Sequence, residues 1–341
     1  MFLKHHSGSR PKQRATYTEK YPMILVTGAT GMVGRHVVAQ LMADHHAVRC
    51  FLPERKRRDL PWDKWLESAP EIITGTVLDE EAIFSAVNGV HTIIHLENAQ
   101  WWGGERDLER VEVVGTRNLI AIARSARVGR IITLSHLGAA PSSAFLLLRI
   151  KGVVEDMVRN SGLAYTIIRS GLIFGPEDAF VNHIAMMLKL NPLVFLLPGQ
   201  GEVVLHPIYI DDLVKTLIQS LGLIDTVDQT IEIGGPEYVT FEELLRTVMR
   251  VTRTHRTLLT TPPYMARWIT ALYGMIFPRT LMTPQWLDIL AASRTARLGN
   301  IHDYFGFHPR RFEDTLTTYL PKRRYLPLAL RYTFRRRPRG L

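Results

Sequence analysis

The chain has 341 residues, of which 46% are hydrophobic and 22% are charged. This composition is ordinary for a folded globular protein and excludes a disordered or fibrous chain. The single cysteine, Cys50, excludes an internal disulfide, and its place in an apolar run favours a small buried hydrophobe. The length fits one large domain with a smaller C-terminal part.

The net charge of +10 is concentrated at the two ends of the chain. Residues 321–341 carry +8 and residues 1–20 carry +4, which leaves −2 for residues 21–320. A body without net positive charge argues against specific nucleic-acid binding. A basic end attracts an anionic membrane surface or the acidic face of a larger protein complex, or is simply solvated.

The sequence shows neither a signal peptide nor an apolar stretch near the roughly 18 residues that span a bilayer. We therefore expect a cytoplasmic protein, and peripheral contact with the inner face of the membrane stays open. We assign no metal site.

The most informative stretch joins a predicted strand, residues 23–26, to a predicted helix. It reads Thr27-Gly28-Ala29-Thr30-Gly31-Met32-Val33-Gly34, and apolar residues recur along the helix at positions 33, 37 and 41. The first glycine lets the chain reverse, the second keeps side chains away from a pyrophosphate, and the third lets helix and strand pack closely. The free N–H groups of the helix start face the phosphates. The stretch predicts a dinucleotide site.

Predicted strands and helices then alternate along the chain. The predicted strands cover residues 47–52, 71–76, 92–96, 130–135 and 164–169, and predicted helices cover residues 82–87 and 147–155. Strands that alternate with helices form a parallel sheet with helices on both faces. We therefore predict an α/β fold with a Rossmann-type doubly wound parallel sheet and a smaller C-terminal α/β part.

The glycine spacing of three and three resembles the extended and atypical short-chain dehydrogenase/reductase superfamily, which includes NAD-dependent epimerases and dehydratases. Residues 169–176, Arg-Ser-Gly-Leu-Ile-Phe-Gly-Pro, are similar to its Arg-Pro-x-x-x-[YF]-Gly-Pro element. Residues 198–212 resemble an element of its substrate-binding half. Together with residues 283–285 and 299–320, these stretches look like the atypical branch, which includes the nucleotide-binding accessory subunit of respiratory complex I and related bacterial NAD(P)-binding proteins.

The charge distribution and the resemblance together indicate four parts. These are a disordered basic arm over residues 1–20, an NAD(P)-binding Rossmann domain over 21–175, a substrate-domain-like part interleaved with the Rossmann core over 176–320, and a basic tail over 321–341. The residues expected to bind the cofactor are Thr27, Gly28, Thr30, Gly31, Met32, Val33, Gly34, Arg55, Val77, His95, Leu96, Ser135, Lys151, Ser170 and Leu172.

The residues at the end of the second strand determine the preference for NAD or NADP. A carboxylate there accepts hydrogen bonds from the ribose of NAD, whereas arginine pairs with the extra phosphate of NADP. Glu54 fits NAD, but the four cations of residues 55–58 favour NADP. The expected cofactor is NADP(H), with NAD(H) as the alternative.

The superfamily's chemistry uses a serine, a tyrosine and a lysine, and the resemblance places these roles at Ser135, Leu147 and Lys151. Lysine holds the nicotinamide ribose and lowers the tyrosine pKa so that the phenol exchanges a proton while hydride moves. Leucine exchanges no proton, so the implied activity is doubtful. His136 is another candidate acid, while Tyr165 and Tyr209 favour core positions.

Two hypotheses remain open. In one, the chain holds NADPH in a structural, sensing or assembly role at a membrane or protein complex. In the other, it is an NAD(P)-dependent oxidoreductase or epimerase that acts on a small carbonyl, sugar-nucleotide or lipid-like substrate with a proton donor other than tyrosine. The apolar residues 264–277 favour a helix packed on the core, with a membrane-surface helix or a cleft wall as alternatives. The Trp101-Trp102 loop walls the nicotinamide end or caps the core.

Two helix starts carry local signals. Asp211 and Asp212 are expected to cap the helix that follows them. Thr240 and Glu243 are expected to form a capping box.

Overall fold

The computed structural model describes residues 22–59, 69–97, 105–191, 193–276, 281–282 and 284–334. The predicted basic arm (1–20), the Trp101-Trp102 loop and the final residues 335–341 lie outside these described residues, as do the side chains of Arg57 and Arg58. None of the described helices is both long enough and apolar enough to cross a bilayer.

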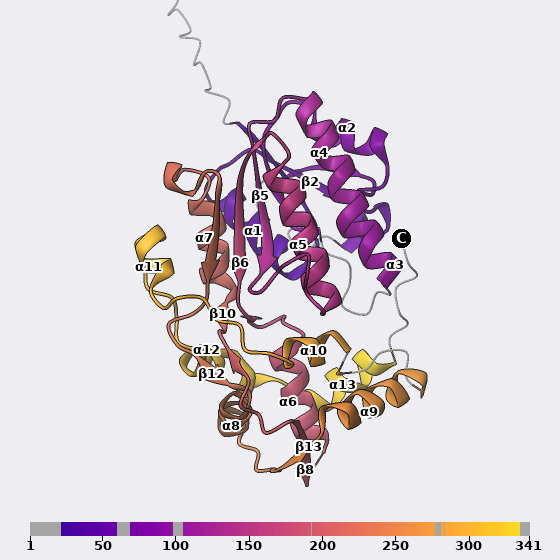
Figure 1. The fold of residues 1–341 in the computed structure, drawn as a ribbon, viewed down its shortest axis with the longest axis vertical. Coiled ribbons are helices and arrows are strands. Elements are labelled where there is room, and N and C mark those ends of the chain that lie inside the picture. Colours follow the sequence, from indigo (N-terminus) through magenta and orange to yellow (C-terminus); the bar gives the residue numbers. More distant parts are fainter. Residues whose placement is uncertain are drawn as a thin grey trace, which may run out of the picture.

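A seven-stranded sheet forms the centre of the larger part of the molecule (Figure 1). Its spatial order is β11-β6-β5-β4-β1-β2-β3, and every neighbouring pair is parallel. The chain order reverses between β1 and β4, which is the switch point where doubly wound sheets bind nucleotides. The predicted fold class is confirmed. The strands are β1 (Met23–Thr27), β2 (Val48–Leu52), β3 (Glu71–Thr74), β4 (Val90–His95), β5 (Arg130–His136), β6 (Ala164–Ser170) and β11 (Gln229–Ile233).

Alternate residues of each central strand enter two different hydrophobic cores, because successive side chains of a strand point to opposite faces. In β5, for example, Ile131 packs in one core and Ile132 in the other. One face is covered by α2 (Glu80–Val87), α4 (Gly115–Ser125) and α5 (Leu146–Arg159), and the other by α1 (Met32–Ala43) and α7 (Ile210–Gln219). Both faces are therefore buried. Between the main elements lie η1 (Glu54–Asp59), α3 (Glu105–Leu108), the π-helical turn η2 (Glu109–Val114) and η3 (Ile224–Thr226).

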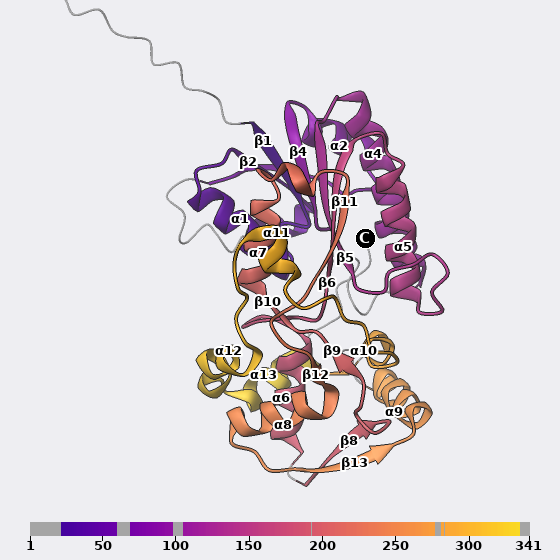
Figure 2. The same ribbon diagram turned by 60° about the vertical axis from the view of Figure 1, so that its left-hand side comes forward.

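The smaller part lies beyond the carboxyl ends of the strands (Figures 1 and 2). Its core is continuous with the core beneath α1 and α7, because the chain leaves the sheet after β6 and returns to it for α7 and β11. Its strands are β7 (Ile173–Phe174), β8 (Val194–Pro198), β9 (Val204–Leu205), β10 (Ile208–Tyr209), β12 (Val239–Thr240) and β13 (Thr257–Thr261). Its helices, with the 3-10 turn η4, are α6 (Phe180–Leu190), α8 (Phe241–Thr252), α9 (Pro263–Ile276), α10 (Pro284–Ile289), α11 (Asn300–Phe305), α12 (Phe312–Tyr319), η4 (Leu320–Lys322) and α13 (Tyr325–Thr333).

The segment that begins the predicted basic tail is folded. Helix α13 packs against α6, with Tyr325 and Ala329 buried, so only residues 335–341 follow the described structure. The capping box of Thr240 and Glu243 at the start of α8 is confirmed.

Candidate functional site

The glycine turn leaves the start of α1 open. Gly31 is the N-cap residue, no side chain caps the helix, and its first turn carries no acidic residue. Gly28 has a φ of +65°, and a Cβ there would lie 2.4 Å from the Leu96 carbonyl oxygen. A Cβ on Gly34 would lie 2.2 Å from the Gly28 carbonyl oxygen. Only glycine permits this approach of strand, turn and helix, and the uncapped N–H groups suit an anion.

His95 supports this turn from inside the protein. One ring nitrogen lies 2.8 Å from Thr27 Oγ1 and the other lies 3.0 Å from Thr116 Oγ1, so the ring links β1, β4 and α4. Burial and then the charge of Lys151 lower the pKa of His95 to about 3, so the ring is neutral. Sequence reasoning assigned His95 to cofactor contact, whereas both of its polar atoms are engaged within the protein.

Glu97 follows β4 and lies beside the turn. Its carboxyl accepts a hydrogen bond from the Gly28 N–H, while burial and then the charge of Glu112 raise its pKa to about 7. Lys151 and Lys56 pull this pKa downward, so both cations lie within electrostatic reach of Glu97. Glu97 follows a strand end, where ligands of parallel sheets bind.

Lys151 forms a buried ion pair with Glu112. Lys151 Nζ on α5 lies 2.8 Å from Glu112 Oε2 on the π-helical turn η2, and both side chains are almost fully buried. The pairing of Glu112 with Lys151 could not be read from the sequence. An ammonium has three N–H donors, so this bond leaves capacity for ribose hydroxyls.

Ser135 points away from the predicted reaction site. Its Oγ donates to Glu155 Oε1 at 2.5 Å, and Glu155 also pairs with Arg169 at 2.7 Å and Arg159 at 2.5 Å. Arg169 reaches Glu232 as well, at 3.1 Å. Hydrogen bonding to Glu155 is the main cause that raises the pKa of Arg169. This network fastens β5, β6, β11 and α5 together, which is a structural role.

A small apolar cavity of about 50 Å³ lies at the ends of β5 and β6. His136, the residue after Ser135, lines it, and burial lowers the His136 pKa to about 4. Arg294 closes one side with its guanidinium over the Phe145 ring, and Leu147 contributes a side chain that is 8% exposed. The other lining residues are Leu137, Leu148, Ser170, Gly171, Leu172, Leu205, His206, Asp288, Ile289 and Ala292.

The remaining predicted residues fall into two groups. Thr27, Gly34 and Val77 are buried, and Val77 packs against Gly115 at the start of α4. Thr30, Gly31, Met32, Val33 and Leu96 reach the surface of the turn, and Arg55 is exposed on η1. The expected cradle is therefore assembled in one place, whereas the two residues expected to do chemistry, Ser135 and Lys151, are held by carboxylates.

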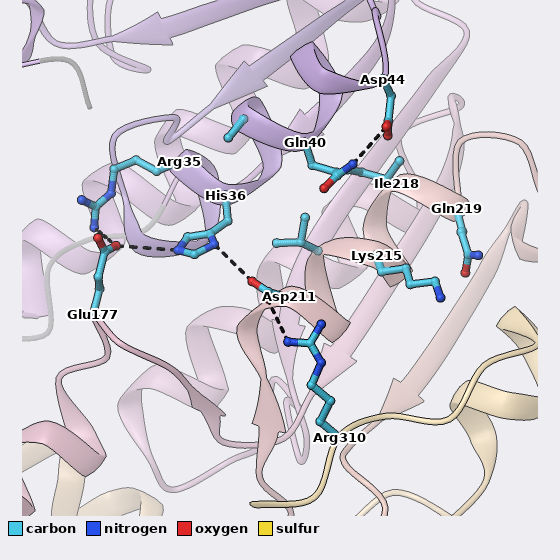
Figure 3. Close-up of a pocket in the computed structure, with 12 residues that line it drawn as sticks. Arg35, His36, Gln40, Asp44, Glu177, Asp211, Lys215, Ile218, Gln219 and Arg310 are labelled. Atoms are coloured by element: carbon cyan, nitrogen blue, oxygen red, sulfur yellow. Dashed lines mark hydrogen bonds and ion pairs between the residues drawn. The ribbon is translucent and has the colours of Figure 1, made fainter. Parts of the chain in front are cut away.

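A groove of about 600 Å³, which several charged side chains line, runs along α1 and α7 (Figure 3). His36 lies between two carboxylates, with Nδ1 3.5 Å from Asp211 and Nε2 3.8 Å from Glu177 (Figure 3). Arg35 pairs with Glu177 at 2.5 Å, and Arg310 pairs with Asp211 at 3.0 Å. These ion pairs link α1 to three places: the segment before α6, helix α7 itself, and the segment before α12.

This network corrects the expected cap of α7. Tyr209 is the N-cap residue, and no side chain caps the helix. Asp211 binds His36 and Arg310, and Asp212 accepts a hydrogen bond from the Arg310 backbone N–H at 2.7 Å. The prediction was wrong because long-range partners outcompete the local backbone for these carboxylates.

Protonation of His36 should stabilise the fold. Hydrogen bonding to Asp211 and then to Glu177 raises the pKa of His36 from 6.5 to about 9. A raised pKa gives stability that is complete below the unfolded value and lost as the pH rises through the folded value. From about pH 6.5 to about pH 10, we expect the free energy of unfolding to fall by about 1–2 kcal/mol, after allowance for solvent screening. Urea denaturation across this pH range measures the decrease, and His36→Gln should lack it. If the free energy of unfolding depended on pH equally in the parent and in His36→Gln, His36 would not be its cause.

Breaking the Lys151–Glu112 pair should be costly, because it strands a buried charge. Lys151→Met should lower the free energy of unfolding by about 3–5 kcal/mol, and Lys151→Met with Glu112→Leu should recover most of that loss. The exposed pair Arg246–Glu242 is the control, where Arg246→Ala should cost less than about 1 kcal/mol. Urea denaturation of the parent chain and the three variants measures these free energies of unfolding. A double variant no more stable than Lys151→Met would show that charge pairing is not the cause.

Comparison with known proteins agrees with this geometry. The family described as NAD(P)H-binding matches residues 28–180. The mouse mitochondrial protein named NADH dehydrogenase [ubiquinone] 1 alpha subcomplex subunit 9 is 31% identical over 262 residues, which cover 73% of this chain and 66% of the mouse protein. The Photosystem II assembly factor Ycf39 of Cyanophora paradoxa is 26% identical over 214 residues, covering 62% of this chain and 63% of that protein. The match thus spans slightly less than two thirds of either relative.

A solved structure shares the fold across most of the chain. The UDP-glucose 4-epimerase of Thermus thermophilus, in complex with NAD, superposes with a TM-score of 0.63 at 17% identity and covers 87% of this chain and 97% of its own. The chain is homologous to the complex I subunit and to Ycf39, its residues 28–180 match the NAD(P)H-binding family, and it shares the fold of the NAD-bound UDP-glucose 4-epimerase.

Proposed function

We propose that this protein binds NADPH and holds it without turnover, in a structural, sensing or assembly role at a membrane or protein complex. One contrast supports the proposal: the phosphate cradle is uncapped, but the cavity beside Leu147 is small. The start of α1 carries no cap and no acidic residue in its first turn. The cavity beside Leu147 holds about 50 Å³, whereas sites for organic ligands measure roughly 300–1,000 Å³.

The residues of the cradle fit a nicotinamide dinucleotide. The N–H groups after Gly28 and Gly31 suit the diphosphate, and Lys151, with donors beyond its bond to Glu112, suits ribose hydroxyls. Bound there, the cofactor would supply hydride chemistry. A phenol is the usual proton source in the superfamily, and the resemblance places that role at Leu147, whose hydrocarbon side chain cannot transfer a proton.

The charges after β2 favour NADPH over NADH. Arg55 is exposed on η1, and Lys56 lies close enough to lower the pKa of Glu97 beside the turn. A guanidinium binds a phosphate through two parallel hydrogen bonds. The names of the two relatives, a complex I subunit and a photosystem assembly factor, support a role within an assembly rather than in metabolism.

A second candidate function is an NAD(P)-dependent oxidoreductase or epimerase acting on a small carbonyl, sugar-nucleotide or lipid-like substrate. One observation favours it: His136 lines the cavity in its neutral form, beside the charges of Lys151 and Arg294 that help to lower its pKa. A neutral imidazole carries one N–H that can donate a proton.

An acidic residue at the start of α1 should strongly weaken cofactor binding while the protein still folds. Gly31 has N-cap backbone angles, φ −68° and ψ 170°, which aspartate and asparagine both accept. Gly31→Asp should therefore fold, yet its carboxylate repels the diphosphate, so the Kd for NADPH should rise on the order of a hundredfold. Gly31→Asn is the neutral control of equal size; its side chain also enters the space that Gly31 leaves for the diphosphate, so it should lose affinity, but less than Gly31→Asp. Calorimetric titration with NADPH and with NADH measures the parent chain and both variants; Kd values equal to that of the parent would place the cofactor elsewhere.

Bound NADPH should stay reduced. We expect no loss of nicotinamide absorbance when the protein–NADPH complex is incubated with panels of aldehydes, ketones, quinones and nucleoside-diphosphate sugars. Oxidation that survives Leu147→Ala and disappears in His136→Gln would instead establish the enzyme with His136 as its proton donor. NADPH titration of each variant separates a lost reaction from lost binding.

A further inference from the structure

Exposed apolar side chains gather in three segments of the smaller part: residues 179–201, 244–287 and 315–341. These segments make up 94 of the 341 residues. Of the 17 large hydrophobic side chains that are exposed in the described structure, 12 lie in them. They are Leu190, Leu193, Leu196, Leu259, Tyr264, Met265, Trp268, Leu272, Met275, Leu326, Leu330 and Phe334.

Helix α9 provides the clearest face. Tyr264, Trp268, Leu272 and Met275 follow one another at spacings of four, four and three residues, which places them on one side of the helix. Trp268 is 76% exposed and Met275 is 82% exposed. Ala266 and Thr270 on the opposite side are buried. The helix is therefore anchored by its small residues and presents its large ones outward, the reverse of a helix that serves only the core.

Figures 1 and 2 place the elements of these segments at one end of the molecule. In both views α6, α8, α9, α13 and the paired strands β8 and β13 lie beyond the sheet, with β8 and β13 at the far tip (Figures 1 and 2). Leu196 and Leu259 are exposed on these two strands. Helix α13 repeats the pattern of α9, since Leu326 and Leu330 are exposed while Tyr325 and Ala329 are buried.

The same three segments contain no acidic residue. They carry 15 of the chain's lysines and arginines, so with a total of +10 the rest of the chain has a net charge of −5. Lys189, Arg253, Lys322, Arg324 and Arg331 are exposed among the apolar residues. Arg267 on α9 pairs with Asp288 at 2.7 Å, which lies just outside the second segment. Four arginines, 335, 336, 337 and 339, follow α13 in the sequence.

We propose that this end of the protein docks on a bilayer that contains anionic lipids. Large apolar side chains with a tryptophan and a tyrosine suit the boundary between headgroups and acyl chains. Exposed cations among them suit anionic headgroups, and each adds to binding. Arg246, Arg250 and Arg267 already pair with Glu242, Glu313 and Asp288, so the other cations carry this part of the argument. A protein surface would need matching acidic and apolar patches, whereas a bilayer offers both chemistries everywhere. The proposal concerns a surface remote from the glycine turn and does not depend on bound NADPH.

Co-sedimentation with vesicles tests the proposal on the full chain. The protein should bind vesicles of phosphatidylcholine mixed with phosphatidylglycerol at least about tenfold more tightly than vesicles of phosphatidylcholine alone, and added salt should weaken that binding. Trp268→Glu and Leu272→Glu should each reduce the binding on the order of tenfold. Arg324→Glu with Arg331→Glu should remove most of the preference for the anionic mixture. Deletion of residues 335–341 should weaken binding while leaving α13 in place.

Matched controls separate docking from folding and from cofactor binding. Phe84→Glu and Arg124→Glu change exposed side chains outside the three segments and should leave vesicle binding intact. Every variant should bind NADPH as the parent chain does. Absent binding to the anionic vesicles, equal binding to both kinds, or Trp268→Glu binding like the parent would each overturn the proposal. The proposal would also be overturned if the chain did not bind vesicles but formed a dimer that Trp268→Glu dissociates. The apolar face would then be the contact surface for a second copy.

Discussion

The close approach between the glycine turn and its neighbours sets the geometry of the site. Gly28 lies against the backbone after β4, and Gly34 lies against the carbonyl of Gly28, at distances that exclude any Cβ. This contact fixes where α1 begins and aims its uncapped N–H groups past the switch point of the sheet. His95, held by two threonines, keeps the strand end in register with the turn. The geometry of the cradle is consequently set by the fold itself.

The fold could be predicted because its signals are local. Continuous apolar runs such as residues 23–26 belong to strands buried on both faces, and the structure shows neighbouring residues feeding opposite cores. The capping box of Thr240 and Glu243 was equally legible, since its partners are three residues apart. Elements whose pattern repeats within a few residues can be predicted without knowledge of the tertiary structure.

The interactions of the site residues were harder to predict, because the residues that pair there are distant in the sequence. Lys151 meets Glu112 across 39 positions, and Asp211 meets Arg310 across 99. No periodicity reports such pairs, so the expected cap of α7 was wrong. Ser135 and His136 show a second limit: adjacent residues at a strand end point in different directions. The sequence placed both near the site, and only coordinates show that His136 lines the cavity while Ser135 binds Glu155.

The separation of charge along the molecule has a further consequence. The described residues of the three segments carry ten lysines and arginines and no acids, and their elements lie at one end of the molecule. The other described residues are net negative, so the protein carries a permanent electric dipole. A dipole in the field of a charged surface experiences a torque at separations up to about the Debye length, ~8 Å in physiological salt. The molecule would be turned toward such a surface before first touching it, with the sheet facing away. The protein would then be oriented during its approach, and it would need little rotational diffusion on the surface to reach the bound orientation.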